Sequence, residues 1–77
     1  MEKIDEDLYK TALSFVVKGG NASITCLQRK FHIGFNKAGA IIEQMEKDGF
    51  IEQFSGAKSR KVLLTKEKFN EIYGEYL

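Results

Sequence analysis

Amide, cationic and hydroxyl side chains gather in two short stretches of this sequence, and they can bind a phosphate-bearing partner. In residues 28–40, Asn36 can form a bidentate contact with adenine, and Lys37 can reach O6 and N7 of guanine. Residues 58–61 add cations and a hydroxyl donor that suit backbone phosphates. The candidate contacts with double-stranded DNA are Gln28, Arg29, Lys30, His32, Gly34, Phe35, Asn36, Lys37, Ala40, Lys58, Ser59, Arg60 and Lys61.

Catalytic and metal chemistry have little support in these residues. Ser23, Cys26 and His32 lie near one another, but the pattern assigns them to a helix cap, a core or near-core position and an exposed turn. A metal site would need a second His or Cys cluster, and a nucleotide loop would need a GxxxxGK[ST] motif. We therefore expect a binding domain that is not an enzyme and uses no metal or cofactor.

The charges are unevenly distributed, although the net charge is only +1. No acidic residue occurs between Asp7 and Glu43, whereas Lys and Arg recur there. Charge separated along a sequence can form a basic face, which is the electrostatic footprint of a phosphate partner. Ordinary solvated lysines and arginines explain the pattern equally well, so the charge alone leaves both interpretations open.

Length and apolar content favour one domain. The 77 residues are 43% hydrophobic and 30% charged, which allows one modest core and little room for an enclosed active-site cavity. The lone Cys26 cannot form an internal disulfide. Neither a signal peptide nor an apolar run near the ~20 residues of a membrane span occurs, so we expect a cytoplasmic chain without membrane contact.

Apolar residues at helical spacing predict three helices before residue 49. The first covers about residues 5–18, and the second covers about residues 24–31 after a very short strand at residues 22–24. Gly34 is expected to take a positive φ in the tight turn that follows. The third helix covers about residues 35–48, which completes a helix-turn-helix.

Beyond Gly49 the spacing of apolar residues becomes that of strands. Residues 50–54 and 61–64 are the predicted strands of a hairpin. Residues 66–76 then form an amphipathic helix that is capped by Thr65 and has an inner face of Phe69, Ile72, Tyr73 and Tyr76. We therefore predict an α+β, mainly helical, winged helix-turn-helix over residues 1–77, with a three-helix core, a small β-hairpin wing and a C-terminal helix.

A helix-turn-helix places the N-terminal residues of its second helix against base edges in the major groove. The base contacts are therefore assigned to Phe35, Asn36, Lys37, Gly39 and Ala40. Residues 28–30 are assigned to phosphates, which position the domain without reading sequence. The hairpin loop around residues 58–61 would lie along the backbone or in the minor groove, and His32 in its turn can contact phosphate.

Several of these residues have structural alternatives. Asn36 can instead cap the third helix, a role that asparagine often fills. Phe35 can pack at the edge of the core or act as a hydrophobic staple. Lys58 and Arg60 can be hairpin cations that only keep the protein soluble.

Residues 22–38 (ASITCLQRKFHIGFNKA) are more specific than a general helix-turn-helix. Together with residues 41–46 (IIEQME), they closely resemble the C-terminal gamma domain of the FtsK/SpoIIIE DNA translocases. Residues 56–64 (GAKSRKVLL) and 66–69 (KEKF) resemble the wing and tail of its Gram-positive type. The likeness covers about residues 7–70.

The resemblance implies a domain that recognises short, polarised, G-rich chromosomal octamers, the KOPS or SRS sequences. It implies that the domain orients or loads a translocase motor in the parent protein during chromosome segregation, and that some members contact a XerD-type recombinase. By position, Asn36 and Lys37 have the base-reading role. Arg29 and Lys30 have the backbone role, and Arg60 matches the arginine of the wing.

Three positions depart from the family pattern. Lys37 and Ala40 each replace an arginine, and Gly39 replaces an alanine. Lysine keeps the charge but lacks the planar fork that pairs with guanine. Losing a bidentate arginine can remove ~1–3 kcal/mol of discrimination. We therefore expect a target that differs from the usual octamer, or less selective binding.

Two other functions remain open. A small free-standing regulator with this fold would bind an operator, and such regulators usually dimerise on pseudo-palindromic sites. Alternatively, the winged helix contacts a recombinase through Phe35 and the acid-free face. The 77 residues contain no motor, so the chain is interpreted as an excised domain or as a free-standing gamma-like protein.

Overall fold

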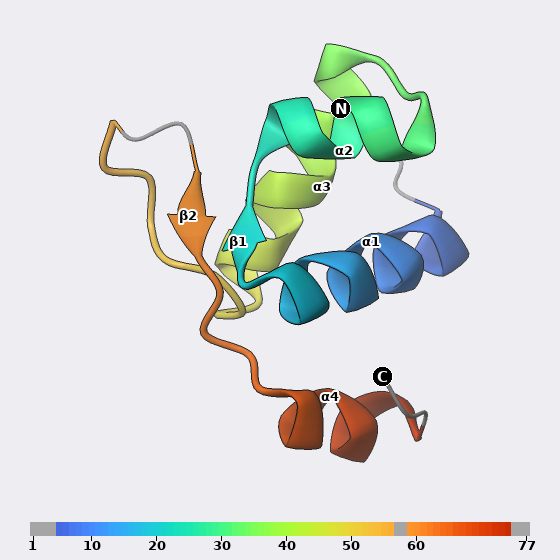
Figure 1. Cartoon of the computed structure of the whole chain (residues 1–77), viewed down its shortest axis with the longest axis vertical. Coiled ribbons are helices and arrows are strands. Elements are labelled where there is room, and N and C mark those ends of the chain that lie inside the picture. The colour runs from blue at the N-terminus through green and yellow to red at the C-terminus, as the bar shows by residue number, and fades with distance from the viewer. Residues whose placement is uncertain (1–4, 57–58, 75–77) are drawn as a thin grey trace.

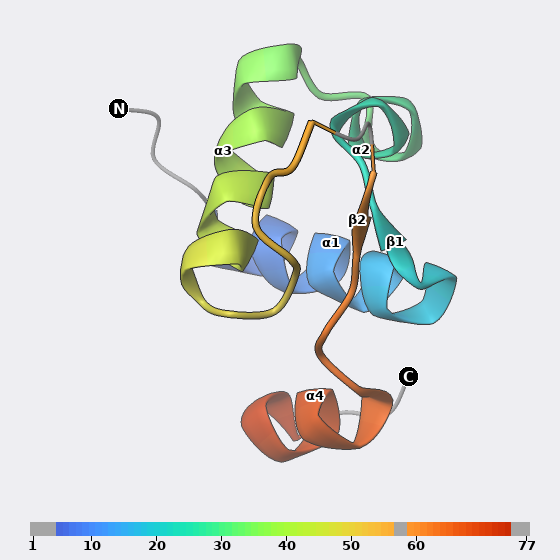
Figure 2. The same ribbon diagram turned by 90° about the vertical axis from the view of Figure 1, so that its left-hand side faces the viewer.

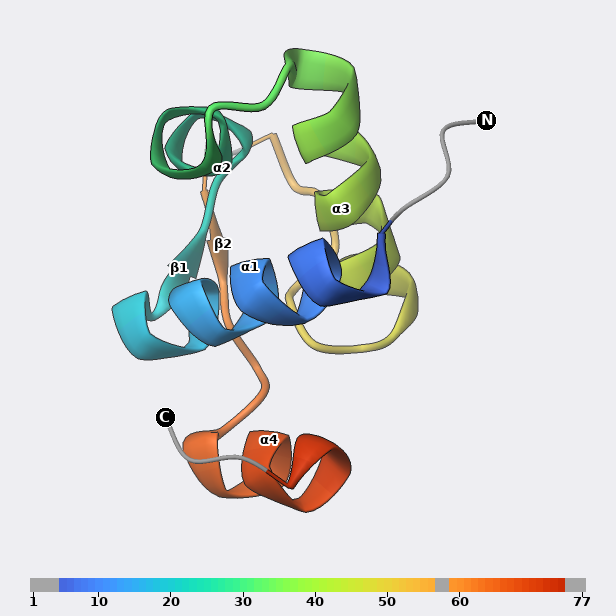
Figure 3. The same cartoon turned by 90° about the vertical axis from the view of Figure 1, so that its right-hand side faces the viewer.

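The computed structural model describes residues 5–56 and 59–74, which adopt a winged-helix fold (Figure 1). The elements in chain order are α1 (Glu6–Gly19), β1 (Asn21–Ala22), α2 (Ile24–Phe31), α3 (Phe35–Lys47), β2 (Arg60–Lys61) and α4 (Lys66–Tyr73). The predicted α+β class is therefore confirmed. Helix α1 lies between α2 and α4 (Figures 2 and 3). Over the described ranges, no helix is long and apolar enough to cross a membrane.

Three side-chain oxygens fix where helices begin. Asp5 accepts hydrogen bonds from the backbone N–H groups of Asp7 and Leu8, at 2.8 and 3.2 Å. Ser23 caps α2 and Thr65 caps α4, each accepting from the backbone N–H three residues later. Such caps satisfy amides that the first helical turn leaves without a partner. The predicted caps at Ser23 and Thr65 are thus confirmed.

The turn between α2 and α3 differs from its prediction. Gly34 has a φ of −74° and forms the extended N-cap of α3, whereas His32 has a φ of 53° and ends α2 in the left-handed region. The expected positive φ at Gly34 is therefore wrong. Because α2 ends at Phe31, the left-handed residue is the one directly after it, and histidine is among the side chains that tolerate this region.

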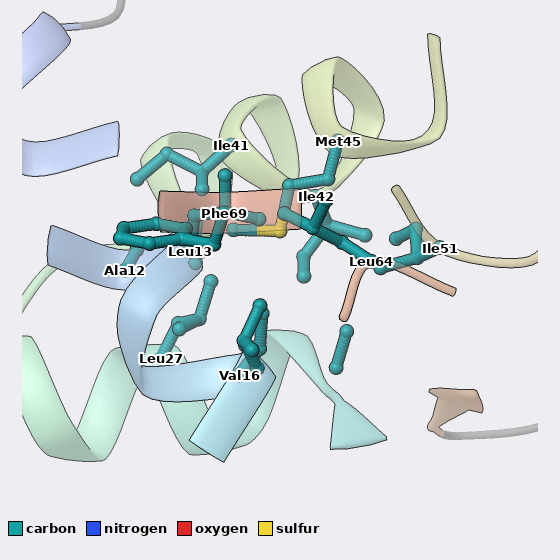
Figure 4. Packing of buried hydrophobic residues seen from close by; sticks show 13 residues of the cluster. Ala12, Leu13, Val16, Leu27, Ile41, Ile42, Met45, Ile51, Leu64 and Phe69 are labelled. Atoms are coloured by element: carbon teal, nitrogen blue, oxygen red, sulfur yellow. The ribbon is translucent and has the colours of Figure 1, made fainter. Parts of the chain in front are cut away.

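The core lies where α1, α2, α3 and α4 meet. Figure 4 shows Phe69 of α4 among Leu13 of α1 and Ile41 and Met45 of α3. The buried hydrophobic residues are Ala12, Leu13, Val16, Val17, Ala22, Leu27, Ala38, Ile41, Ile42, Met45, Ile51, Leu64 and Phe69.

Two residues expected in or near this core lie outside it. Cys26 is exposed, because the inward side of α2 carries Leu27 at the next position, about 100° further round the helix. Ile72 is 47% exposed, because Phe69 and Tyr73 are the residues of α4 that turn toward the core. The remaining predicted inner residue, Tyr76, lies outside the described residues.

The wing is paired differently from the predicted hairpin. Strand β1 pairs antiparallel with β2, with Ala22 opposite Arg60. Residues 50–54 do not form the expected strand and contribute one bridge, Ile51 to Val62. The chain leaves the ladder after Glu52 because the backbone N–H of Phe54 donates to a side chain of α3 instead of a neighbouring strand.

Candidate nucleic-acid interface

Helix α3 carries a polar stripe on the side that faces away from the core. Its buried residues Ala38, Ile41, Ile42 and Met45 point inward. At about 100° per residue, the opposite side holds Asn36, Ala40 and Glu43. Asn36 and Glu43 are exposed, and Ala40 is half-buried. Helix α4 packs on α1 and does not cover this stripe (Figures 1 and 2).

Two structural alternatives for the start of α3 are wrong. Asn36 does not cap the helix, since the N-cap is Gly34 and no side chain bonds to that end. Phe35 is not at the core edge, because the residue is 63% exposed. Both residues therefore stand at the solvent-facing beginning of α3, as a groove-contacting helix requires.

Lys37 and Gly39 flank the stripe on opposite sides. Lys37 is half-buried and lies about 100° round the helix from Asn36, toward the packed face. A Cβ added at Gly39 would come within 3.9 Å only of the Ile24 side chain, an ordinary contact. The glycine is thus not required by a close approach of α2 to α3.

Helix α2 supplies cations beside the start of α3. Arg29 and Lys30 are exposed, and Gln28 is half-buried. The ammonium nitrogen of Lys30 lies 5.6 Å from the centroid of the Phe15 ring of α1, a contact worth about 0.5–1 kcal/mol at an exposed site. His32 and Gly34 are exposed in the turn between the two helices.

The candidate residues of the wing divide into two kinds. Ser59 and Lys61 are exposed, and Lys58 lies outside the described residues. Arg60 has a side chain that is only 14% exposed, and its Nη1 lies 2.8 Å from Oε2 of Glu46 on α3. Arg60 is therefore paired with a carboxylate of α3, which contradicts the alternative that it is a hairpin cation that only keeps the protein soluble.

An open groove of about 890 Å³ follows the outward side of α3. Its lining includes Asn36, Ala40 and Glu43 from the stripe, and Arg60 from the base of the wing. The groove also reaches Tyr9 of α1, whose hydroxyl donates to Oδ2 of Asp48 at 2.6 Å. Burial and this bond to Asp48 raise the pKa of Tyr9 above its usual range, so the phenol remains a donor.

Glu43 is a candidate that sequence reasoning missed. It lies seven residues after Asn36 and therefore on the same side of α3, and a carboxylate in the major groove can accept from the amino group of cytosine. The i, i+4, i+7 spacing of positions 36, 40 and 43 was the signal that could have found it. The apolar residues between them indicate only which side of the helix faces the core.

Nothing in the described residues adds metal chemistry to this face. No group of three or more His, Cys, Asp or Glu side chains that could hold a metal ion occurs in residues 5–56 and 59–74. The candidate residues that are described supply hydrogen-bond donors and acceptors, cations and the exposed ring of Phe35.

Comparison with known proteins identifies similar sequences. Residues 3–65 match the family model described as the Ftsk gamma domain. The DNA translocase SpoIIIE of Bacillus subtilis (strain 168) is 39% identical over 70 residues, which cover 91% of this chain and 9% of that protein. The DNA translocase SftA of the same strain is 43% identical over 63 residues, 82% of this chain and 7% of that protein. The DNA translocase FtsK of Clostridium tetani is 44% identical over 62 residues, 80% of this chain and 8% of that protein. The chain thus spans less than a tenth of each of these proteins.

Proposed function

Because this chain belongs to the FtsK gamma domain family, we propose that it binds double-stranded DNA sequence-specifically and thereby orients or loads a chromosome translocase during segregation. The observation that carries the proposal is the polar stripe of α3, which no other described element covers. A winged helix presents such a stripe to the major groove.

The dimensions of α3 fit this role. From Asn36 to Glu43 the helix rises by about 10 Å, which equals the rise of about three base pairs. Asn36 would read adenine at one end of this span, and Glu43 would read cytosine at the other. Arg29 and Lys30 would hold phosphates on one side of α3, and Lys61 with Ser59 would do so from the wing.

The preferred sequence should be short and polarised, and it should differ from the G-rich octamers of the family. A single copy of the domain has no symmetry, so its bound site has a direction that a motor can follow. Ala40 and Lys37 supply no guanidinium fork, which weakens guanine readout by ~1–3 kcal/mol for each lost bidentate contact.

Selection from a randomised duplex pool tests the proposal. Wild type should enrich one short motif, and Asn36→Ala should change the preferred base at one position and cost ~1–3 kcal/mol on the wild-type motif. Lys37→Ala should shift the preference at a neighbouring position. Lys68→Ala serves as the control, since Lys68 lies on the exposed side of α4 and pairs with Glu71. An unchanged preference in Asn36→Ala would remove the base-reading assignment.

A protein contact is the second candidate, because Phe35, an aromatic residue at the start of α3, is 63% exposed. In that case α3 would contact a recombinase of the XerD type. A fluorescence titration with random duplex separates the two functions. Affinity that falls steeply with salt belongs to DNA binding, whereas absence of affinity at low salt favours the protein contact.

A further inference from the structure

The base of the wing is joined to α3 at one carboxylate oxygen. Oε2 of Glu46 accepts from Nη1 of Arg60 at 2.8 Å and from the backbone N–H of Phe54 at 2.8 Å. The guanidinium carbon of Arg60 lies 5.3 Å from the centroid of the Phe54 ring. Residues on both sides of the wing loop therefore converge on a single side chain of the helix.

Arg60 is also fixed through its backbone. It pairs with Ala22 of β1, which is 1% exposed and lies directly before the Ser23 cap of α2. Its side chain is 14% exposed, and that of Glu46 is 30% exposed. Turning the guanidinium toward a phosphate would leave a partly buried carboxylate without its cation, which is unfavourable.

We propose that Arg60 and Glu46 are positioning residues that set the wing at a fixed distance from α3, and that Arg60 does not neutralise a phosphate. The inference rests on the proposed DNA binding. Arg60 lines the same groove as Asn36 and Glu43, so its ion pair with Glu46 lies where α3 and the wing would both contact one duplex. Lys61, exposed on the next residue, is then the cation of β2 that meets the backbone.

The salt dependence of binding distinguishes positioning from a phosphate contact. The logarithm of the binding constant falls with the logarithm of the salt concentration by about 0.9 for each phosphate that the protein neutralises. Arg60→Met should weaken binding about two- to tenfold and leave this slope unchanged. Lys61→Met, the matched control one residue away, should reduce the slope by about 0.9.

For Glu46→Met, the positioning role and the phosphate contact predict opposite changes in DNA affinity. If the ion pair of Arg60 with Glu46 positions the wing, this substitution weakens DNA binding even though it removes a negative charge near the DNA. If Arg60 contacts phosphate, the same substitution releases it and tightens binding. The double variant should bind no more weakly than either single variant, because both remove the same constraint.

The outcomes separate this inference from the function on which it rests. A wild type without affinity for duplex DNA would overturn both. A wild type that binds, with a slope reduced by about 0.9 in Arg60→Met or tighter binding by Glu46→Met, would overturn the positioning role alone. Circular dichroism checks that each variant is folded, and if Arg60→Met is not, the sign of the Glu46→Met effect decides.

Discussion

The outward side of α3 and the junction of α1 with α4 are opposite in character. At the junction, Phe69 is 1% exposed and its ring lies 4.8 Å from that of Tyr73. On α3, Asn36 and Glu43 are exposed, and both lie on the side of the helix opposite its buried residues. One region is held by apolar contacts, and the other presents polar groups that add little to the fold. Stability and recognition should therefore respond to different substitutions.

The junction also extends beyond the family match. That match ends at residue 65, whereas α4 begins at Lys66 and still places Phe69 in the core. The contrast between the two regions predicts that α4 contributes to folding without contributing to recognition. Four substitutions test this contrast.

Phe69→Ala should have the largest effect on stability. Removing a fully buried aromatic side chain costs about 3–5 kcal/mol in the free energy of unfolding, measured by urea denaturation. Ile72→Ala on the same helix is the control and should change stability by less than about 0.5 kcal/mol, because Ile72 is 47% exposed. Similar losses in the two variants would mean that α4 does not pack as described.

Ala40→Arg should act on recognition alone. An arginine on the outward stripe can pair with O6 and N7 of guanine, so preference for guanine at one position should rise by ~1–3 kcal/mol in a selection experiment. Ile72→Arg adds the same charge to the exposed side of α4 and controls for general attraction to DNA. If both variants gain affinity equally and neither changes base preference, position 40 does not face base edges.

Tyr9→Phe should produce a smaller loss, in stability. It removes the 2.6 Å bond to Asp48, which links α1 to the end of α3. Asp48 is exposed and keeps its bond from Gln44, so the cost should be about 1–2 kcal/mol in the free energy of unfolding.

The pH dependence gives an independent check on Tyr9. Its pKa is raised in the folded state, so its contribution is complete below the unfolded tyrosine pKa of 10.0 and is lost as the pH rises above that value. Wild type should therefore lose stability above about pH 10, and Tyr9→Phe should lose less over the same range. Identical pH profiles would show that the phenol ionises equally in both states.

Features that depend on local spacing could be predicted from the sequence. The apolar period places the start of α3 at Phe35, and Thr65 and Phe69 mark the cap and inner side of α4, as the structure confirms. The resemblance of residues 22–38 to the gamma domain is confirmed by the family match.

Features that depend on contacts between distant segments could not be predicted. The pairing of β1 with β2 joins Ala22 to Arg60, and no local pattern states which segments will be neighbours. The bond between Glu46 and Arg60 has the same origin, since the two residues are 14 positions apart and the sequence assigned Arg60 to DNA and gave Glu46 no partner. Glu43 was missed because its exposure in the groove depends on which side of α3 the rest of the fold leaves uncovered.

The smallest expected effect concerns His32, which lies in the turn between α2 and α3. A side chain in the left-handed region costs about 1–2 kcal/mol, and glycine avoids that cost but loses about 0.5–1 kcal/mol through greater freedom of the unfolded chain. With φ at 53°, His32→Gly should therefore raise the free energy of unfolding by about 0.5–1 kcal/mol. His32→Ala is the matched control, because it removes the imidazole without relieving the backbone and should give no gain. If His32 also contacts phosphate, both variants should lose DNA affinity, while only the glycine variant becomes more stable. A parallel change in DNA affinity and in the free energy of unfolding would contradict the separation of folding from recognition.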